Sequence, residues 1–249
     1  MGFRRVFNRL FSSSRYRLCT AGELKALAAA ARSPYEAIAR REIPAAIQTI
    51  FDVGANIGQT TRELRGLFPA AFIHAFEPTP ASRDQFLLQH GRDPRVRLWP
   101  YALSDQPGPI EFFVNKRSMT NSLLPSEPAS AQWVGAENVE NVTTIRVERK
   151  TLDEFCAEQT VSRLDILKLD IQGSELDALR GAAGLLERKA IGYICLEAPF
   201  LPLYRGQPMF HEIVQFLEPW GYRVYGLFKL ARHESDRLLF ADALFFREP

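Results

Sequence analysis

The residues of this 249-residue chain best suited to chemistry follow a short apolar run, in the stretch FDVGANIGQTT at positions 51–61. The run delivers a carboxylate, Asp52, and then a loop with glycines at Gly54 and Gly58. In an open α/β sheet, ligands bind beyond the carboxyl ends of the strands, so this loop is a candidate nucleotide site. A phosphate-binding P-loop requires the pattern GxxxxGK[ST]. The loop contains no lysine, which excludes that class.

The glycine spacing and the carboxylate separate the two remaining ligand classes, dinucleotides and S-adenosylmethionine. A dinucleotide fingerprint reads GxGxxG, but Asn56 stands where its middle glycine would be. An Asp52 carboxylate that faces the pocket repels a pyrophosphate and attracts a cation such as a sulfonium. We therefore expect S-adenosylmethionine, with a nicotinamide-dependent oxidoreductase as the alternative. The loop residues expected to bind the cofactor are Asp52, Gly54, Ala55, Asn56 and Gly58.

Two further strand ends supply groups of the kind that a nucleoside requires. Glu77, in the stretch FEP, lies 25 residues after Asp52 and can accept hydrogen bonds from both ribose hydroxyls. The next apolar run ends in YALSD, whose first residues can flank an adenine. Taken singly, each of these features is also compatible with an ordinary helix cap or turn. The contacts predicted from the two strand ends are Glu77, Pro78, Tyr101, Ala102 and Leu103.

Two carboxylates are the candidates for the chemical step. Methyl transfer to a hydroxyl needs an aligned acceptor oxygen and removal of its proton by a nearby base. Asp170, in KLDIQGSE, and Glu197, in CLEAP, follow two later apolar runs, and Asp170 is also a candidate cofactor contact. Lys168 points to the same side of the strand as Asp170, so the alternative is a structural ion pair between Lys168 and one of the carboxylates. A magnesium site would need a further oxygen ligand, so no metal is expected.

Strands that alternate with helices must position these residues. From residue 47 onward, apolar runs alternate with amphipathic segments, which predicts a Rossmann-like, doubly wound α/β fold with a parallel sheet. The last two runs have no helix between them and are expected to pair antiparallel. The expected strands are 46–53, 71–78, 96–104, 163–171, 190–198, 222–228 and 241–247, with extended pieces at 110–114 and 143–150; the expected helices are 60–67, 82–90, 174–188, 209–220 and one that begins after Thr151.

The first 46 residues are expected to form a helical extension, separate from a catalytic domain at 47–249. Helix caps are indicated at Thr20 and Ser33, each followed by a glutamate three residues later. In residues 1–18, phenylalanines and other apolar residues recur at helical spacing beside several arginines. Such a helix either packs on the main domain or makes peripheral contact with an anionic membrane surface.

The segment 115–141 has no clear hydrophobic periodicity and is long for a connection within a domain. Segments of this kind are usually functional or disordered. Four apolar residues allow it to pack as a lid or as a wall of the substrate site: Met119, Leu123, Leu124 and Trp133.

Composition narrows the class of partner and the compartment. The formal net charge is +2, from 31 basic and 29 acidic residues, which lacks the basic excess that nucleic-acid binding needs. The three cysteines are far apart, which indicates a reducing compartment rather than a disulfide framework. We expect a cytoplasmic protein with a small-molecule or glycan acceptor, with association at the inner membrane face as the alternative. The sequence does not indicate an oligomeric state.

Taken in order, the stretches IFDVGANIGQTT, HAFEP, ALSD, KTLDEF and LDILKLDIQGSELDALRGA resemble the FkbM family of class I S-adenosylmethionine-dependent methyltransferases. The resemblance extends from about Ile50 to Pro249. It implies a seven-stranded sheet with an antiparallel last strand. It also implies O-methylation of a hydroxyl in a sugar, polysaccharide, glycolipid or natural product, although a non-catalytic cofactor-binding scaffold is a further alternative. The chain departs from the family pattern DxEG, because Gln172 precedes Gly173, so a role that needs a charge there is not carried over.

Overall fold

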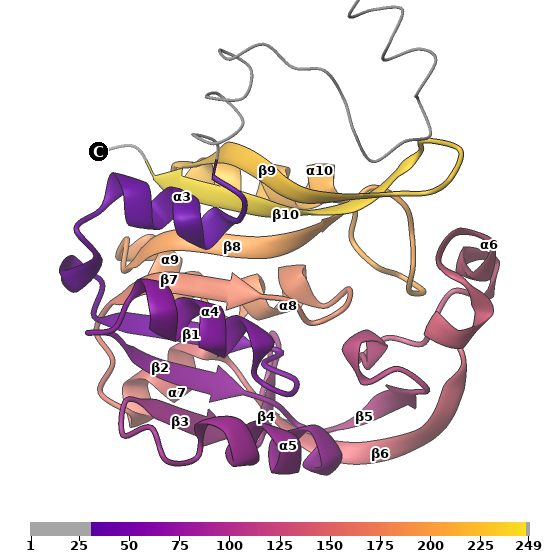
Figure 1. The fold of residues 1–249 in the computed structure, drawn as a ribbon, viewed down its shortest axis with the longest axis horizontal. Coiled ribbons are helices and arrows are strands. Elements are labelled where there is room, and N and C mark those ends of the chain that lie inside the picture. Colours follow the sequence, from indigo (N-terminus) through magenta and orange to yellow (C-terminus); the bar gives the residue numbers. More distant parts are fainter. Residues whose placement is uncertain (1–30, 248–249) are drawn as a thin grey trace, which may run out of the picture. The chain divides into compact units, whose positions relative to one another are not determined.

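A seven-stranded sheet forms the centre of the fold in the computed structural model, which describes residues 31–247 (Figure 1). The strand order is β3-β2-β1-β7-β8-β10-β9, and β10 runs antiparallel to both of its neighbours. This confirms the expected Rossmann-like, doubly wound topology with an antiparallel last strand. The strands of this sheet are β1 (Thr49–Val53), β2 (Phe72–Phe76), β3 (Val96–Trp99), β7 (Leu164–Leu169), β8 (Ile191–Pro199), β9 (Tyr222–Arg232) and β10 (Leu238–Arg247).

Helices cover both faces of the sheet, with α3 to α5 on one face and α7 to α10 on the other (Figure 1). The expected cap at Ser33 is present, and Thr151 caps α7 in the same way: their side chains accept hydrogen bonds from the backbone N–H groups of Glu36 and Glu154. The helices are α3 (Pro34–Arg41), α4 (Gln59–Leu67), α5 (Pro80–His90), α6 (Ala131–Val134), α7 (Leu152–Glu158), α8 (Glu175–Arg180), α9 (Ala183–Glu187) and α10 (Phe210–Leu217), with short 3-10 turns η1 (Pro44–Ala46) and η5 (Glu218–Trp220).

The expected strand at 96–104 is divided in two, which corrects the sequence prediction. Pro100 separates β3 from β4 (Tyr101–Leu103), because proline has no N–H to continue the ladder. β4 then leaves the main sheet and pairs with β6 (Asn141–Lys150), which also pairs with β5 (Gly108–Asn115). The two extended pieces of the sequence analysis therefore belong to a second, three-stranded sheet.

The expected helix at 174–188 is also divided, into α8 and α9, around Gly181. A Cβ atom at Gly181 would lie 2.1 Å from the carbonyl oxygen of Ser104, at the end of β4. The backbone at Gly181 therefore approaches the end of β4 more closely than any larger residue permits.

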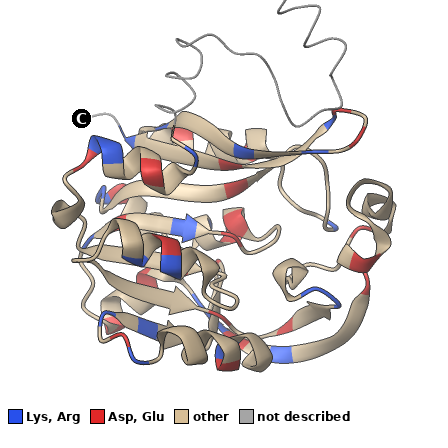
Figure 2. Cartoon of the chain, in the orientation of Figure 1, with Lys and Arg blue, Asp and Glu red and all other residues tan. Residues whose placement is uncertain are grey.

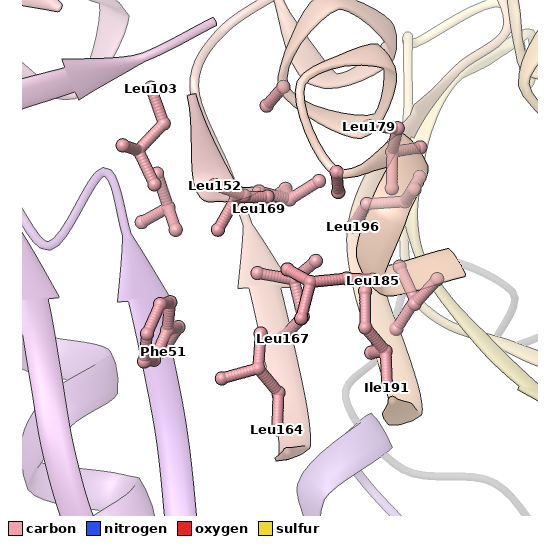
Figure 3. Packing of buried hydrophobic residues seen from close by; sticks show 14 of the residues in the cluster. Phe51, Leu103, Leu152, Leu164, Leu167, Leu169, Leu179, Leu185, Ile191 and Leu196 are labelled. Atoms are coloured by element: carbon pink, nitrogen blue, oxygen red, sulfur yellow. The ribbon is translucent and has the colours of Figure 1, made fainter. Parts of the chain in front are cut away.

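The core lies mainly between the sheet and α7 to α10. Figure 3 shows the apolar side chains of β7 and β8 packed against leucines of the helices on this face, including Leu152, Leu179 and Leu185. All six residues of β7 are buried, as expected for a central parallel strand covered on both faces. Such a strand is held rigidly, so its carboxyl end is a firm support for a site.

Between β5 and β6, the segment 115–141 consists of short turns and one helix rather than regular secondary structure. It contains η2 (Ser118–Thr120), η3 (Pro128–Ser130), α6 and η4 (Ala136–Asn138). Isolated bridges tie it to the rest of the molecule, from Ser122 to Phe113 and from Ser126 to Tyr204. It is thus an ordered wall beside the two sheets.

The remaining expectations concern the N-terminus and the molecular surface. A compact unit begins at Ser33, and the division between 46 and 47 stays a prediction. The amphipathic pattern of residues 1–18 and the cap at Thr20 lie outside the described residues. Within residues 31–247, no helix combines the length and apolar character needed to cross a bilayer. Basic and acidic residues are interspersed in the view of Figure 2.

Candidate cofactor and acceptor site

A cavity of about 610 Å3 lies at the carboxyl ends of the parallel strands. It falls within the usual size range of small-molecule sites, roughly 300–1,000 Å3. Its walls come from the ends of β1, β2, β7 and β8, from β4, from the segment 115–141 and from the start of β10. The two sheets therefore build one site together.

The glycine loop after β1 is fixed against the ends of its neighbouring strands. The N–H groups of Gly54 and Ala55 both donate to the carbonyl of Phe76, at 3.0 and 2.9 Å. Gly54 has φ +75°, and a Cβ atom there would lie 1.9 Å from the carbonyl oxygen of Asp170. Only glycine fits this combination of positive φ and close approach. Gly54, Ala55 and Asn56 all line the cavity.

Gly58 has a different place from the one expected. It caps α4 with φ +95° and is absent from the cavity lining. A Cβ atom at Gly58 would meet the ring of His90 at 2.4 Å. Gly58 thus allows α5 to pack closely against the loop, whereas Gln59 and Thr60, which the sequence analysis did not select, line the cavity instead.

Asp52 also departs from the expectation, because its carboxylate does not face the pocket. The residue is fully buried and does not line the cavity. One carboxylate oxygen accepts a hydrogen bond from Thr61 Oγ1 at 2.6 Å, and the other lies 2.9 Å from the ammonium of Lys168. The electrostatic argument drawn from a carboxylate facing the pocket is therefore corrected: Asp52 supports the loop from beneath.

Lys168 connects β7 to the glycine loop. Its ammonium donates to the backbone carbonyls of Val53 and Gly54 at 3.1 and 2.9 Å, and its distance to the Asp170 carboxylate is 4.0 Å. Burial acts to lower the pKa of Lys168, but the carboxylates of Asp52, Asp170 and Glu77 together outweigh it, so the pKa is raised. The structural ion pair that the sequence suggested is therefore present, with Asp52 rather than Asp170 or Glu197 as the close partner.

Glu77 lies where the sequence placed it, at the end of β2 and in the cavity wall. Its Oε2 accepts from the N–H of Asn56 at 3.0 Å, and its Oε1 accepts from the N–H of Thr79 at 2.9 Å and from the Thr79 hydroxyl. Burial raises the pKa of Glu77, and the hydrogen bonds from Thr79 offset part of that rise. Because a carboxylate has about four lone-pair sites, it retains capacity for a ligand hydroxyl.

An apolar wall stands beside Glu77. Pro78, Tyr101, Ala102 and Leu103 all line the cavity, as the sequence analysis expected. Tyr101 lies on β4, and the ammonium of Lys150, on the neighbouring strand β6, lies 5.0 Å from the centre of its ring. A largely apolar wall next to a carboxylate suits a nucleoside, whose base is apolar on its faces and whose ribose is polar.

Gln172, the residue at which the chain departs from the family pattern DxEG, links Asp170 to Glu197. The Gln172 amide nitrogen donates to Asp170 Oδ1 at 2.7 Å and to Glu197 Oε2 at 3.3 Å. Its amide oxygen accepts from the hydroxyl of Tyr204 at 2.7 Å. All four residues line the cavity. A neutral amide thus bridges the two candidate catalytic carboxyl groups.

The backbone at Gln172 is held as firmly as its side chain. Gln172 and Gly173 both have positive φ, +54° and +101°, and the buried Ser122 hydroxyl donates to the Gln172 carbonyl at 2.6 Å. The buried Glu175 accepts from the N–H groups of Ile171 and Gly173. The turn that carries the amide is therefore anchored from the segment 115–141 and from α8.

Burial dominates the electrostatics of the carboxyl groups around this turn. Burial raises the pKa of Glu197, and the neighbouring Asp170 raises it further. Burial also raises the pKa of Glu175 to about 7. Raised carboxyl pKa values in a cavity mark a candidate functional site. Within the part of the chain that the structure describes, no group of three or more potential His, Cys, Asp or Glu metal ligands is found.

The segment 115–141 contributes a wall, but only part of it was foreseen. Met119 and Leu123 line the cavity, whereas Leu124 and Trp133 do not. The Trp133 ring contacts His233 edge-on at 5.2 Å and lies 4.9 Å from the Arg237 guanidinium. Trp133 thus holds the wall against the β9–β10 turn. Sequence reasoning missed Tyr204, which only the fold brings to Gln172.

The sequence comparisons match this chain to methyltransferases. A family model described as "Methyltransferase FkbM domain" matches residues 52–224. A 2-O-methyltransferase, NoeI, from Sinorhizobium fredii is 29% identical over 177 residues, which cover 68% of this chain and 70% of the relative. A hexuronic acid methyltransferase, AglP, from Haloferax volcanii is 25% identical over 149 residues. That alignment covers 59% of this chain and about half of the relative's length, 54%.

Solved structures include a 1,6-didemethyltoxoflavin-N1-methyltransferase from Burkholderia thailandensis. It is 14% identical to this chain, with a TM-score of 0.46, and the match covers 99% of this chain and 89% of that one.

Proposed function

The chain belongs to the FkbM methyltransferase family, and from this premise we propose that it is an S-adenosylmethionine-dependent O-methyltransferase. We infer that the acceptor is a hydroxyl of a sugar, glycolipid, polysaccharide or natural product. Two relatives support the hydroxyl and the sugar, since one is named a 2-O-methyltransferase and another a hexuronic acid methyltransferase. The single observation that carries the cofactor assignment is Glu77, buried at the end of β2 in the wall of the cavity.

The residues of the cavity suit this cofactor. Glu77 would accept a hydrogen bond from a ribose hydroxyl at Oε2, while Tyr101, Ala102 and Leu103 would flank the adenine. The glycine loop allows the backbone at Gly54, Ala55 and Asn56 to approach the rest of the molecule closely. When bound, S-adenosylmethionine supplies an electrophilic methyl group on a positively charged sulfur.

The remaining chemistry falls to Asp170 and Glu197. A base that removes the acceptor proton typically contributes 10²- to 10⁴-fold to the rate. Asp170 is the proposed base, because its side chain is 45% exposed and lies at the end of β7. Glu197, with a raised pKa, is suited to hold a proton and to donate a hydrogen bond to the acceptor. The Gln172 amide keeps both carboxyl groups in place.

Calorimetric titration of the purified chain tests the proposal. We expect S-adenosylmethionine and S-adenosylhomocysteine to bind and NAD⁺ and NADH not to bind. Binding of a nicotinamide cofactor alone would favour the oxidoreductase alternative. Binding of the methyl donor without methyl transfer to any hydroxyl acceptor would favour a non-catalytic scaffold.

A further inference from the structure

Some of the residues that line the cavity are not assigned to the cofactor, and they surround the space available to the acceptor. The lining of this space includes Asp170, Gln172 and Glu197, the Tyr204 side chain that donates to Gln172, and residues of the segment 115–141. The polar residues that this segment contributes carry hydroxyl or amide groups and no charge: Ser118, Thr120, Asn121, Ser126 and Asn138. Such groups exchange hydrogen bonds with hydroxyls and bring no positive charge to balance an anion.

The charged side chains of the lining are predominantly acidic. Among the described residues that line the cavity, Glu77, Asp170 and Glu197 carry carboxyl groups, and Lys168 carries the only positive side chain. The ammonium of Lys168 is already engaged by the Asp52 carboxylate and two backbone carbonyls. Its next carboxylate neighbour is Asp170, at 4.0 Å, so its charge is already shared between two acids of the protein.

Basic residues near this wall in sequence do not alter the balance. Lys116 and Arg117 belong to the segment 115–141 but are not part of the lining. Lys116 lies 3.0 Å from the Glu140 carboxylate, and Arg117 lies 3.5 Å from that of Glu137. Each is thus paired with an acid outside the cavity.

Gln172 keeps this part of the cavity acidic. A cation between Asp170 and Glu197 would cancel the charge of Asp170, but the bridging group is an amide, which donates hydrogen bonds and carries no charge. The charge of the Asp170 carboxylate is therefore offset only by the Lys168 ammonium at 4.0 Å, which lies closer to Asp52, at 2.9 Å. The sulfonium of the proposed cofactor adds one positive charge, which Glu77 and Asp170 together outnumber.

We propose that the part of the acceptor that enters this cavity is uncharged, as in a neutral sugar or another polyol, and that uronates and phosphate esters are disfavoured. The inference rests on the proposed function and narrows its substrate class. An anionic substituent here would face carboxylates across a partly dehydrated space, where like charges repel much more strongly than in water. A neutral hydroxyl would meet donors and acceptors on both walls.

Matched probes test this inference on the full chain saturated with S-adenosylhomocysteine. The probes are p-nitrophenyl β-D-glucopyranoside, the corresponding glucuronide, and the methyl ester of that glucuronide, which restores neutrality at similar size. We expect the glucuronide to bind at least about tenfold more weakly than the glucoside and its own ester at low ionic strength. Salt should reduce the difference, because mobile ions screen charges.

Removing the carboxylate charge of Asp170 gives a second test of the same inference. Asp170→Asn should reduce the preference for neutral probes, and Asp177→Asn, on α8 and outside the lining, should leave it unchanged. Equal or tighter binding of the glucuronide, or no binding of either neutral probe, overturns the inference. If the unaltered chain does not bind S-adenosylhomocysteine at all, the proposed function is overturned instead. Failure of the inference and failure of the proposed function are therefore distinguishable.

Discussion

At the scale of single residues, Glu77 has two tasks at once. It fixes the glycine loop through the N–H of Asn56 and the start of α5 through Thr79, and it presents its carboxyl group to the cavity. A carboxylate can do both, because each oxygen accepts more than one hydrogen bond. An amide cannot, since its nitrogen is a donor that would face another donor.

Replacing Glu77 by glutamine therefore tests the ribose assignment. We expect Glu77→Gln to weaken S-adenosylhomocysteine binding by about 1–3 kcal/mol, the usual cost of leaving a buried polar group without a partner. Calorimetry measures the affinity, and thermal unfolding checks that the fold persists. Glu187→Gln, an exposed change on α9, is the matched control. Unchanged affinity in Glu77→Gln would remove the ribose role.

Asp170 is the second residue whose role can be isolated. In Asp170→Asn the Oδ1 atom still accepts from Gln172, so the turn should keep its geometry while the base is lost. We expect turnover to fall by roughly 10²- to 10⁴-fold with cofactor affinity little changed. Single-turnover kinetics with S-adenosylmethionine give the rate. A variant with normal turnover would show that another group takes the proton.

At the scale of elements, the close contact between the glycine loop and the end of β7 decides how the site is assembled. Gly54 sits against the Asp170 carbonyl, and Lys168 ties the same loop from beneath. Strand β7 therefore positions both the loop and the proposed base. A shift of one relative to the other would disturb cofactor and acceptor together.

The substitution Gly54→Ala tests this contact. The added Cβ would lie 1.9 Å from a backbone oxygen at φ +75°, so we expect a loss of unfolding free energy of about 2 kcal/mol or more and weakened cofactor binding. Gly66→Ala, within α4, meets nothing within 4 Å and should stabilise by about 0.5–1 kcal/mol. Denaturant titration measures both, and equal effects in the two variants would contradict the close-packing argument.

At the scale of the whole molecule, buried carboxyl groups link stability to pH. Burial raises the pKa of Glu175 from 4.5 to about 7, and it also raises the pKa values of Glu77, Glu197 and Asp242. A folded state that holds a proton more tightly than the unfolded chain is most stable while that proton is present. For Glu175 this contribution is complete below about pH 4.5 and is lost as the pH rises through about 7.

The expected result is a lower free energy of unfolding at pH 8 than at pH 5. The Glu175 contribution is up to about 3 kcal/mol, at 1.36 kcal/mol per pKa unit. Glu175→Gln should remove much of the difference, because its amide oxygen can still accept from Ile171 and Gly173 without a charge to desolvate. Denaturant unfolding at both pH values measures this, and an undiminished difference in the variant would assign it to other groups.

The sequence by itself determined the order of the main strands and helices along the chain, and most of the site residues that it predicted do line the cavity. Periodicity in apolar runs is a local property, so it is legible without a structure. The same holds for Glu77 and for the residues after β3, since the carboxyl ends of parallel strands meet at one edge of the sheet.

Only the tertiary structure decided what each side chain faces. Asp52 and Gly58 lie in the right stretch, yet one turns inward to Lys168 and the other packs on His90. Tyr204 reaches Gln172 from 32 positions away, and β4 leaves the main sheet to pair with β6. These are partnerships between distant segments, and they are settled by packing and charge pairing in three dimensions rather than by local spacing.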